Sequence, residues 1–121
     1  MREKRQTKFV TPEEAVQAVR NGDWVDYGFG AGFPELLDRA LAGRKGDVQD
    51  VKIRGGLVIR PRIEVVEQDP EQESFTYYSW HIGDYERKLQ SRGLVRFMPA
   101  MLRSLPYLYR DGHIRCDVAF V

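Results

Sequence analysis

Residues 24–34 read Trp-Val-Asp-Tyr-Gly-Phe-Gly-Ala-Gly-Phe-Pro, a stretch that combines strand, loop and helix signals. Its first four residues have the aromatic and β-branched composition of a short strand. Three glycines then fall within five residues, and Pro34 opens a helix that is expected to run to Leu41. Glycine permits positive φ and lets a ligand approach the backbone closely. The stretch therefore predicts a strand, a ligand-facing glycine loop and a helix in succession.

The same alternation of strand and helix continues along the chain. Further strands are expected at 51–54, 75–78, 95–98 and 117–121, and helices at 34–41, 61–66, 84–89 and 101–109. An earlier helix begins at Thr11, which forms a capping box with Glu14. Pro106 is expected to interrupt the last helix or to mark a break in it, because proline lacks an N–H donor. Elements that alternate in this way indicate an α/β fold with a mostly parallel sheet and flanking helices.

The glycine loop is open to three interpretations. N–H groups at the start of the following helix favour an anion or a developing oxyanion, which describes a binding loop. A dinucleotide-binding fingerprint, G-x-G-x-x-G, needs glycine at position 33, where the chain has Phe33. Pro34 also removes one donor from the helix start. A tight structural turn without a ligand is the third interpretation, and glycine spacing alone does not exclude it.

Composition and charge exclude several classes of function. A length of 121 residues, with 42% hydrophobic and 31% charged residues, is typical of one globular domain. The net charge of +1 gives no electrostatic reason to expect binding to nucleic acid or to an anionic membrane. No apolar run approaches the roughly 20 residues that span a bilayer. The single cysteine, Cys116, and a polar amino terminus without a secretory signal predict a cytoplasmic protein. His81, His113 and Cys116 lack the paired spacing of a metal site.

The last predicted strand, 117–121, bears on domain organisation. Ligands of open α/β sheets bind on the loops beyond the carboxyl ends of the strands, and the chain stops before such a loop. We therefore expect residues 1–121 to be a fragment of a larger protein. A terminal strand that simply closes the sheet is the alternative.

Several blocks of the sequence carry a family resemblance. The first is Gly22–Leu37, which contains the glycine loop, and the others are Val51–Leu57, Ser79–His81, Tyr85–Lys88, Leu105–Arg110 and Asp117–Val121. In this order, the blocks resemble the amino-terminal part of the acetyl-CoA hydrolase/transferase family, covering nearly the whole chain from about Phe9. The similarity is strongest to its butyryl-CoA:acetate and 4-hydroxybutyrate CoA-transferase branch.

The resemblance implies a fold, a reaction and a division of labour between domains. Residues 1–121 would form the amino-terminal domain, of the CoA-transferase (NagB/RpiA-like) type, of a larger two-domain enzyme. In this family a glutamate attacks the acyl-CoA thioester, giving a mixed anhydride and then a glutamyl-CoA thioester that an incoming carboxylate resolves. That glutamate belongs to the carboxyl-terminal half. No glutamate of this chain lies in a matching context, so we assign no catalytic residue and expect the chain alone to be inactive.

The resemblance also implies substrates and assembly. The substrates would be an acyl-CoA of the acetyl, butyryl or 4-hydroxybutyryl type and a short-chain carboxylate, which places the enzyme in acetate and acyl-CoA metabolism. Coenzyme A enters as a substrate thioester, and no permanently bound cofactor is expected. A homo-oligomer is expected for the full-length protein. The choice between transferase and hydrolase depends on exclusion of water from the intermediate, which the resemblance does not specify.

Substrate binding is assigned to residues of the glycine loop and to one histidine. They are Gly28, Phe29, Gly30, Gly32, Phe33 and His81. The two phenylalanines would shape an acyl chamber, while Gly30 and Gly32 keep the backbone close to the ligand. His81 follows a predicted strand and can hydrogen-bond a carboxylate or thioester oxygen, with a structural role among its aromatic neighbours as the alternative.

Other functions stay open at this point. A set of basic residues can either meet coenzyme A phosphates or form a solvated surface: Arg54, Arg60, Arg62, Arg87 and Lys88. An acyl-CoA hydrolase is one alternative to a transferase. A non-catalytic acyl- or nucleotide-binding module is a second. A small dinucleotide-dependent enzyme is a third, and Phe33 disfavours it.

Overall fold

A computed structural model describes residues 6–121, and its centre is a five-stranded sheet in which neighbouring strands are parallel. The strands are β1 (Trp24–Tyr27), β2 (Val51–Gly55), β3 (Phe75–Ser79), β4 (Val95–Phe97) and β5 (Val118–Phe120). They lie in the order β4-β3-β2-β1-β5. The predicted α/β fold with a mostly parallel sheet and flanking helices is confirmed.

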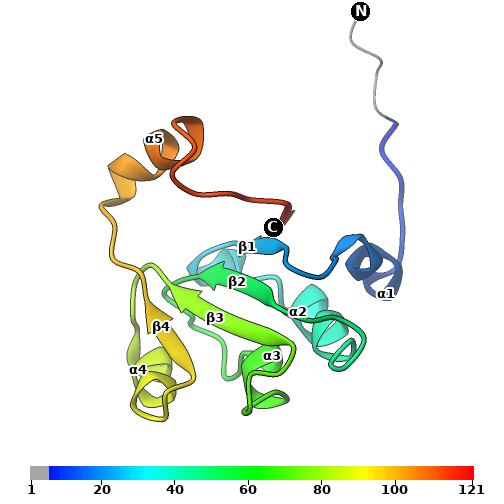
Figure 1. The fold of residues 1–121 in the computed structure, drawn as a ribbon, viewed down its shortest axis with the longest axis horizontal. Coiled ribbons are helices and arrows are strands. Elements are labelled where there is room, and N and C mark those ends of the chain that lie inside the picture. Colours follow the sequence, from blue (N-terminus) through cyan, green and yellow to red (C-terminus); the bar gives the residue numbers. More distant parts are fainter. Residues whose placement is uncertain (1–5) are drawn as a thin grey trace, which may run out of the picture.

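The helices divide between the two faces of the sheet. They are α1 (Pro12–Ala15), α2 (Glu35–Ala42), α3 (Glu64–Glu67), α4 (Asp84–Ser91) and α5 (Leu105–Arg110), with 3₁₀ turns η1 (Val16–Ala18), η2 (Gly30–Gly32) and η3 (Leu102–Ser104). From β1 to β4 each connection steps one strand in the same direction, whereas the β4–β5 connection returns across the sheet. Because parallel crossovers are almost always right-handed, reversing the direction moves the connecting helix to the other face. Figure 1 shows α2, α3 and α4 on one side of the sheet and α5 on the other.

The hydrophobic core lies between the sheet and helices α2 to α4. One lateral row of side chains crosses all five strands in register: Val118, Val25, Ile53, Tyr77 and Val95. All belong to the buried core or pack against it, together with helix residues such as Leu41 and Leu89. Burial of each such large apolar side chain stabilises the fold by about 1.5–3 kcal/mol. This core fixes the register of the strands, and so fixes where their carboxyl-end loops meet.

The opposite face of the sheet carries polar and aromatic side chains. The lateral row next to the core row contains Ala119, Asp26, Arg54, Tyr78 and Arg96. The β4–β5 connection passes over this face (Figure 1). Side chains that alternate between a dry face and a polar face are expected from the period of two residues in a strand.

One predicted helix start is confirmed and another is wrong. The capping box at Thr11 is confirmed, with hydrogen bonds of 3.2 Å to the Glu14 N–H and 2.9 Å back to the Glu14 carboxylate. The predicted start of a helix at Pro61 is wrong: α3 begins at Glu64, after Ile63 in an extended conformation with φ of −111°. Its first N–H groups donate to Asp38 on α2, a long-range partner that no local pattern reveals.

Pro106 marks a break in the predicted helix 101–109, as expected, because the 3₁₀ turn η3 ends at Ser104 and α5 begins at Leu105. It lies in the first turn of α5, where the missing N–H would have no intrahelical partner in any case. The preceding turn, η3, is the part that departs from α-helical geometry. Within residues 6–121, no helix has both the length and the apolar character needed to cross a membrane.

Candidate functional site

An apolar cavity lies where the loops after strands β1 to β3 meet the β4–β5 connection. Its volume is about 240 Å³, and its lining consists of Phe29, Leu57, Trp80, His81, Ala100, Leu102 and Leu105. The carboxyl edge of a parallel sheet is the usual place for a ligand in open α/β folds. A wider groove of about 340 Å³ lies between the amino-terminal segment and α2, lined in part by Val10 and Leu37. That groove receives no loop from β2, β3 or β4, so the smaller cavity is the candidate site.

The glycine loop lies at the point where the winding of the sheet reverses. The Gly28 N–H donates to the Phe120 carbonyl at 3.0 Å, which joins the end of β1 to the end of β5. The loop then turns back on itself, with the Gly32 N–H donating to the Phe29 carbonyl at 2.8 Å. A Cβ atom on Gly28 would stand 2.2 Å from the Gly32 oxygen, so only glycine fits there. Gly30 has φ of +54°, a conformation that glycine adopts without strain.

The residues assigned to substrate binding separate into three groups. Phe29 and His81 both line the cavity, although they come from loops after different strands. Gly28, Gly30 and Gly32 form the turn that presents Phe29, as just described. Phe33 is buried in the core below the loop, where its ring packs edge-on to Tyr27 with centroids 5.5 Å apart. Phe33 thus supports the loop from beneath and is not part of the cavity lining.

Leu57 is a cavity residue that the sequence interpretation did not single out. It follows β2, is 44% exposed and has φ of +47°, which is uncommon for a residue with a side chain. Its N–H donates to the His81 carbonyl at 2.8 Å, so it is held against the next loop. Strained backbone of this kind is concentrated at ligand sites. The Gly55-Gly56 pair that precedes Leu57 was the available signal, because glycines after a strand mark a close backbone approach.

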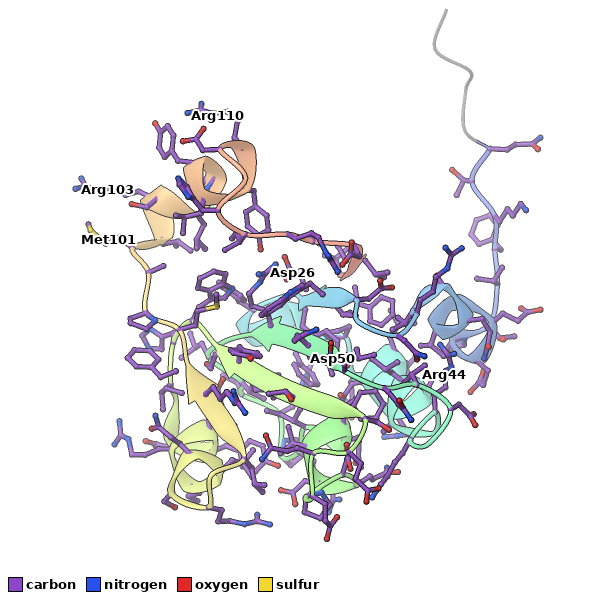
Figure 2. All side chains as sticks on the ribbon, viewed as in Figure 1. Asp26, Arg44, Asp50, Met101, Arg103 and Arg110 are labelled. Atoms are coloured by element: carbon purple, nitrogen blue, oxygen red, sulfur yellow. The ribbon has the colours of Figure 1, made fainter. Side chains whose placement is uncertain are left out.

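The β4–β5 connection supplies the remaining wall of the cavity. Ala100, Leu102 and Leu105 line it from this side. Figure 2 shows Met101, Arg103 and Arg110 projecting from the same connection away from the sheet. These three residues follow Leu57 by 43 to 48 positions in the chain, so only the tertiary fold brings them to the cavity.

Arg54 lies beside the cavity, but its charge is not available to a ligand. Its side chain is 1% exposed, and its Nε and Nη2 atoms lie 2.7 and 2.6 Å from one oxygen of Asp26. The guanidinium also packs 5.4 Å from the ring centre of Trp80, 5.3 Å from that of Tyr109 and 4.9 Å from that of Trp24. Burial and the hydrogen bond to Asp26 raise the pKa of the Tyr109 hydroxyl.

The other basic residues considered above lie on the surface. Arg60 is 3.8 Å from Glu35, and Arg62 is 3.1 Å from Glu64. Arg87 and Lys88 are exposed on α4. Neither pair lines the cavity.

The chemistry that the site offers is apolar packing and one imidazole. Of the cavity-lining residues, only His81 can carry a positive charge, and none is a glutamate or an aspartate. In the described part of the chain, no group of three or more His, Cys, Asp or Glu side chains could hold a metal ion. The cavity is therefore suited to an apolar group that ends in an oxygen-bearing function.

The sequence family is decided by a match over the full length of the chain. The family profile described as "Acetyl-CoA hydrolase/transferase N-terminal domain" matches residues 1–121. The chain belongs to this family.

Two relatives that the chain matches are much longer proteins. The chain is 38% identical over 120 residues to the butyryl-CoA:acetate CoA-transferase of Anaerostipes caccae, covering 99% of the chain and 27% of that protein. It is 35% identical over 119 residues to a probable butyrate:acetyl-CoA coenzyme A-transferase of Syntrophomonas wolfei, covering 98% of the chain and 26% of that protein. The chain thus spans about a quarter of the length of these relatives.

A solved structure has the same fold. RipA from Yersinia pestis superposes with a TM-score of 0.69 at 26% identity, over 86% of this chain and 26% of that one. The parallel sheet with its flanking helices is therefore shared with RipA.

Proposed function

We propose that this domain forms one wall of the acyl site in a CoA-transferase that exchanges coenzyme A between an acyl-CoA and a short-chain carboxylate. The observation that carries the proposal is the apolar cavity at the carboxyl edge of the sheet, in a domain whose named relatives are transferases of this type. An acyl chain of the acetyl, butyryl or 4-hydroxybutyryl type would lie against Phe29 and Leu57. His81 would donate a hydrogen bond to a carboxylate or thioester oxygen.

In this proposal, the nucleophilic glutamate comes from polypeptide outside the chain. No glutamate among residues 6–121 lines the cavity. Glu86 is the only fully buried glutamate among the described residues, and both of its oxygens accept hydrogen bonds from the protein. A carboxylate held in this way cannot approach a thioester. Residues 1–121 would accordingly act as the amino-terminal domain of a longer enzyme, joined to a carboxyl-terminal domain.

The proposal extends to the setting of the enzyme. Acyl-CoA and a short-chain carboxylate are its substrates, so coenzyme A enters as a thioester and no permanently bound cofactor is needed. We place the enzyme in the cytoplasm and in acetate metabolism, as a homo-oligomer when full length.

A chimera tests the proposal directly. In it, this chain replaces the corresponding 120 residues of the A. caccae relative, which supplies the remaining three quarters of the enzyme. We expect the chimera to form acetyl-CoA from butyryl-CoA and acetate, while the 121-residue chain alone forms none. The folded state of both proteins is checked by circular dichroism. A folded chimera without exchange activity would refute the proposal, and so would exchange by the isolated chain.

Hydrolysis of the acyl-CoA is the second candidate, because the family description includes hydrolases. The two reactions differ in what resolves the intermediate, a carboxylate or water. Release of free coenzyme A without added acetate, measured with a thiol reagent, identifies a hydrolase. Release that requires acetate and yields acetyl-CoA identifies a transferase.

A further inference from the structure

Glu86 lies in the first turn of α4 and is 0% exposed. One oxygen of its carboxylate accepts hydrogen bonds from the Gly83 N–H at 2.9 Å and from the Val58 N–H at 3.2 Å. The other oxygen lies 2.5 Å from the Ser79 hydroxyl. These three donors belong to three different segments: the loop after β2, the end of β3 and the turn before α4. A single buried carboxylate therefore joins all of them.

The loops that Glu86 joins are the two that carry Leu57 and His81. The backbone pairing of β2 and β3 continues beyond the strands, because the Trp80 N–H donates to the Gly55 carbonyl and the Leu57 N–H donates to the His81 carbonyl, both at 2.8 Å. The Ser79 hydroxyl also lies 2.9 Å from the His81 carbonyl. Glu86 adds a further link between the two loops, because it accepts from Val58, the residue after Leu57, and from Gly83 in the turn after His81.

We propose that Glu86 is a positioning residue that fixes the separation of Leu57 and His81 across the cavity. It touches no cavity surface itself and acts through the Val58 and Gly83 backbone. A carboxylate suits this task, because it can accept from two N–H groups and a hydroxyl at once, and charge-assisted hydrogen bonds are stronger than neutral ones. The catalytic consequence rests on the proposed function, whereas the structural tether does not.

Amide hydrogen exchange on the 121-residue protein tests the tether without any activity. In Glu86→Ala, the Val58 and Gly83 amides lose their acceptor, and we expect their exchange to accelerate by about tenfold or more. The Ile53 amide in β2 should keep its wild-type rate, which shows that the opening is local. Glu86→Gln should show a much smaller increase, because its amide oxygen can accept from both N–H groups while its NH₂ faces Ser79. Wild-type exchange at Val58 and Gly83 in Glu86→Ala would overturn the tether.

Asp69→Asn is the matched control. Asp69 is also buried and also accepts three hydrogen bonds, here all from backbone N–H groups, those of Glu73, Ser74 and Phe75, at the opposite end of β3. In Asp69→Asn the amide oxygen can still accept from Ser74 and Phe75 while its NH₂ faces Glu73, so we expect faster exchange at Glu73 and unchanged exchange at Val58 and Gly83. Acceleration at Val58 in Asp69→Asn would mean that general loosening, and not Glu86, controls the loop.

The catalytic consequence is measured in the chimera with the A. caccae relative. If Leu57 and His81 are held less firmly, the rate of turnover should fall more than the affinity for substrate. We therefore expect Glu86→Ala to lower kcat about tenfold or more with a smaller change in KM. Glu86→Gln should recover most of kcat, and Asp69→Asn should keep wild-type kcat below its melting temperature. Faster exchange at Val58 with an unchanged kcat would refute the positioning role. A wild-type chimera without exchange activity would instead refute the proposed function and leave the tether standing.

Discussion

Two nitrogen atoms of Arg54 on β2 reach the same carboxylate oxygen of Asp26 on β1, at 2.7 and 2.6 Å. The guanidinium is almost completely buried, so this contact neutralises a charge that has no access to water. Removing Asp26 alone leaves the Arg54 guanidinium buried without its carboxylate partner. We therefore expect Asp26→Ala to lower the free energy of unfolding by about 3–5 kcal/mol, measured by urea denaturation.

The double variant provides the control for this prediction. With Arg54→Met added, the stranded charge is gone and apolar atoms fill part of the space between Trp24 and Trp80. We expect Asp26→Ala/Arg54→Met to be more stable than Asp26→Ala. A double variant that is less stable than Asp26→Ala would show that the aromatic contacts of Arg54, and not its pairing, dominate.

The geometry of the glycine loop leads us to expect a large loss of stability for one glycine substitution and almost none for another. A methyl group at position 28 collides with the Gly32 carbonyl, whereas nothing lies within 4 Å of a Cβ at position 32. Gly28→Ala is expected to lower the free energy of unfolding by about 1–3 kcal/mol. Gly32→Ala is expected to change it by less than about 0.5 kcal/mol. Thermal melts of the two variants make the comparison, and equal losses would contradict the described turn.

Asp38 makes the stability of the fold depend on pH. Burial raises its pKa from 3.8 to about 6, although the Glu64 and Val65 N–H groups that it accepts from oppose the shift. The native state therefore holds a proton that the unfolded state has lost between these values, so this residue's contribution to stability falls as pH rises through the window. Relative to that of Asp38→Asn, the free energy of unfolding of the wild type should rise by roughly 3 kcal/mol on going from above pH 6 to below pH 4. Urea denaturation of both proteins across this range measures it, and a constant difference would contradict the shift.

Phe29 is predicted to limit the length of the acyl chain. In the chimera, Phe29→Ala enlarges the cavity, so we expect its ratio of kcat/KM for hexanoyl-CoA to that for acetyl-CoA to rise about tenfold or more. Phe9→Ala is the matched control, because Phe9 is fully exposed and lies outside the cavity. An unchanged ratio in Phe29→Ala would remove the acyl chain from this wall.

His81 is predicted to bind the polar end of the substrate. His81→Ala in the chimera should lower kcat/KM about tenfold or more through loss of a hydrogen bond to a charged or developing oxyanion group. The only other histidine, His113, is exposed on the β4–β5 connection and absent from the cavity lining, so His113→Ala should keep wild-type kinetics. Equal kinetics for both variants would assign His81 a structural role.

The fold was largely predictable because its elements carry local signals. β1 was predicted with its observed bounds, Trp24–Tyr27, and the other four strands to within one residue at each end. The Thr11 capping box is equally local. The start of α3 was missed because its cap is Asp38, 26 residues earlier in the chain.

The cavity was less predictable, because its walls come from distant segments. Phe29 and His81 could be predicted from the sequence, because each follows a predicted strand and parallel strands bring such loops together. Phe33 was assigned to the acyl chamber by its position in the same loop, but the turn directs its ring into the core against Tyr27. Leu102 and Leu105 reach the cavity only because the β4–β5 connection recrosses the sheet.

The pairing of β1 with β5 also affects the order in which the strands can assemble during biosynthesis. Asp117 is 93 residues from Trp24, whose N–H it accepts, while the partners of β1 on its other side lie in β2. During translation, β1 to β4 can assemble first, and one edge of β1 keeps unpaired N–H and C=O groups until Phe120 emerges from the ribosome. The glycine loop, which is tied to Phe120 through Gly28, therefore acquires its final shape among the last parts of the domain. A nascent chain that stalls before this point presents an open β-edge to the chaperones of the cell.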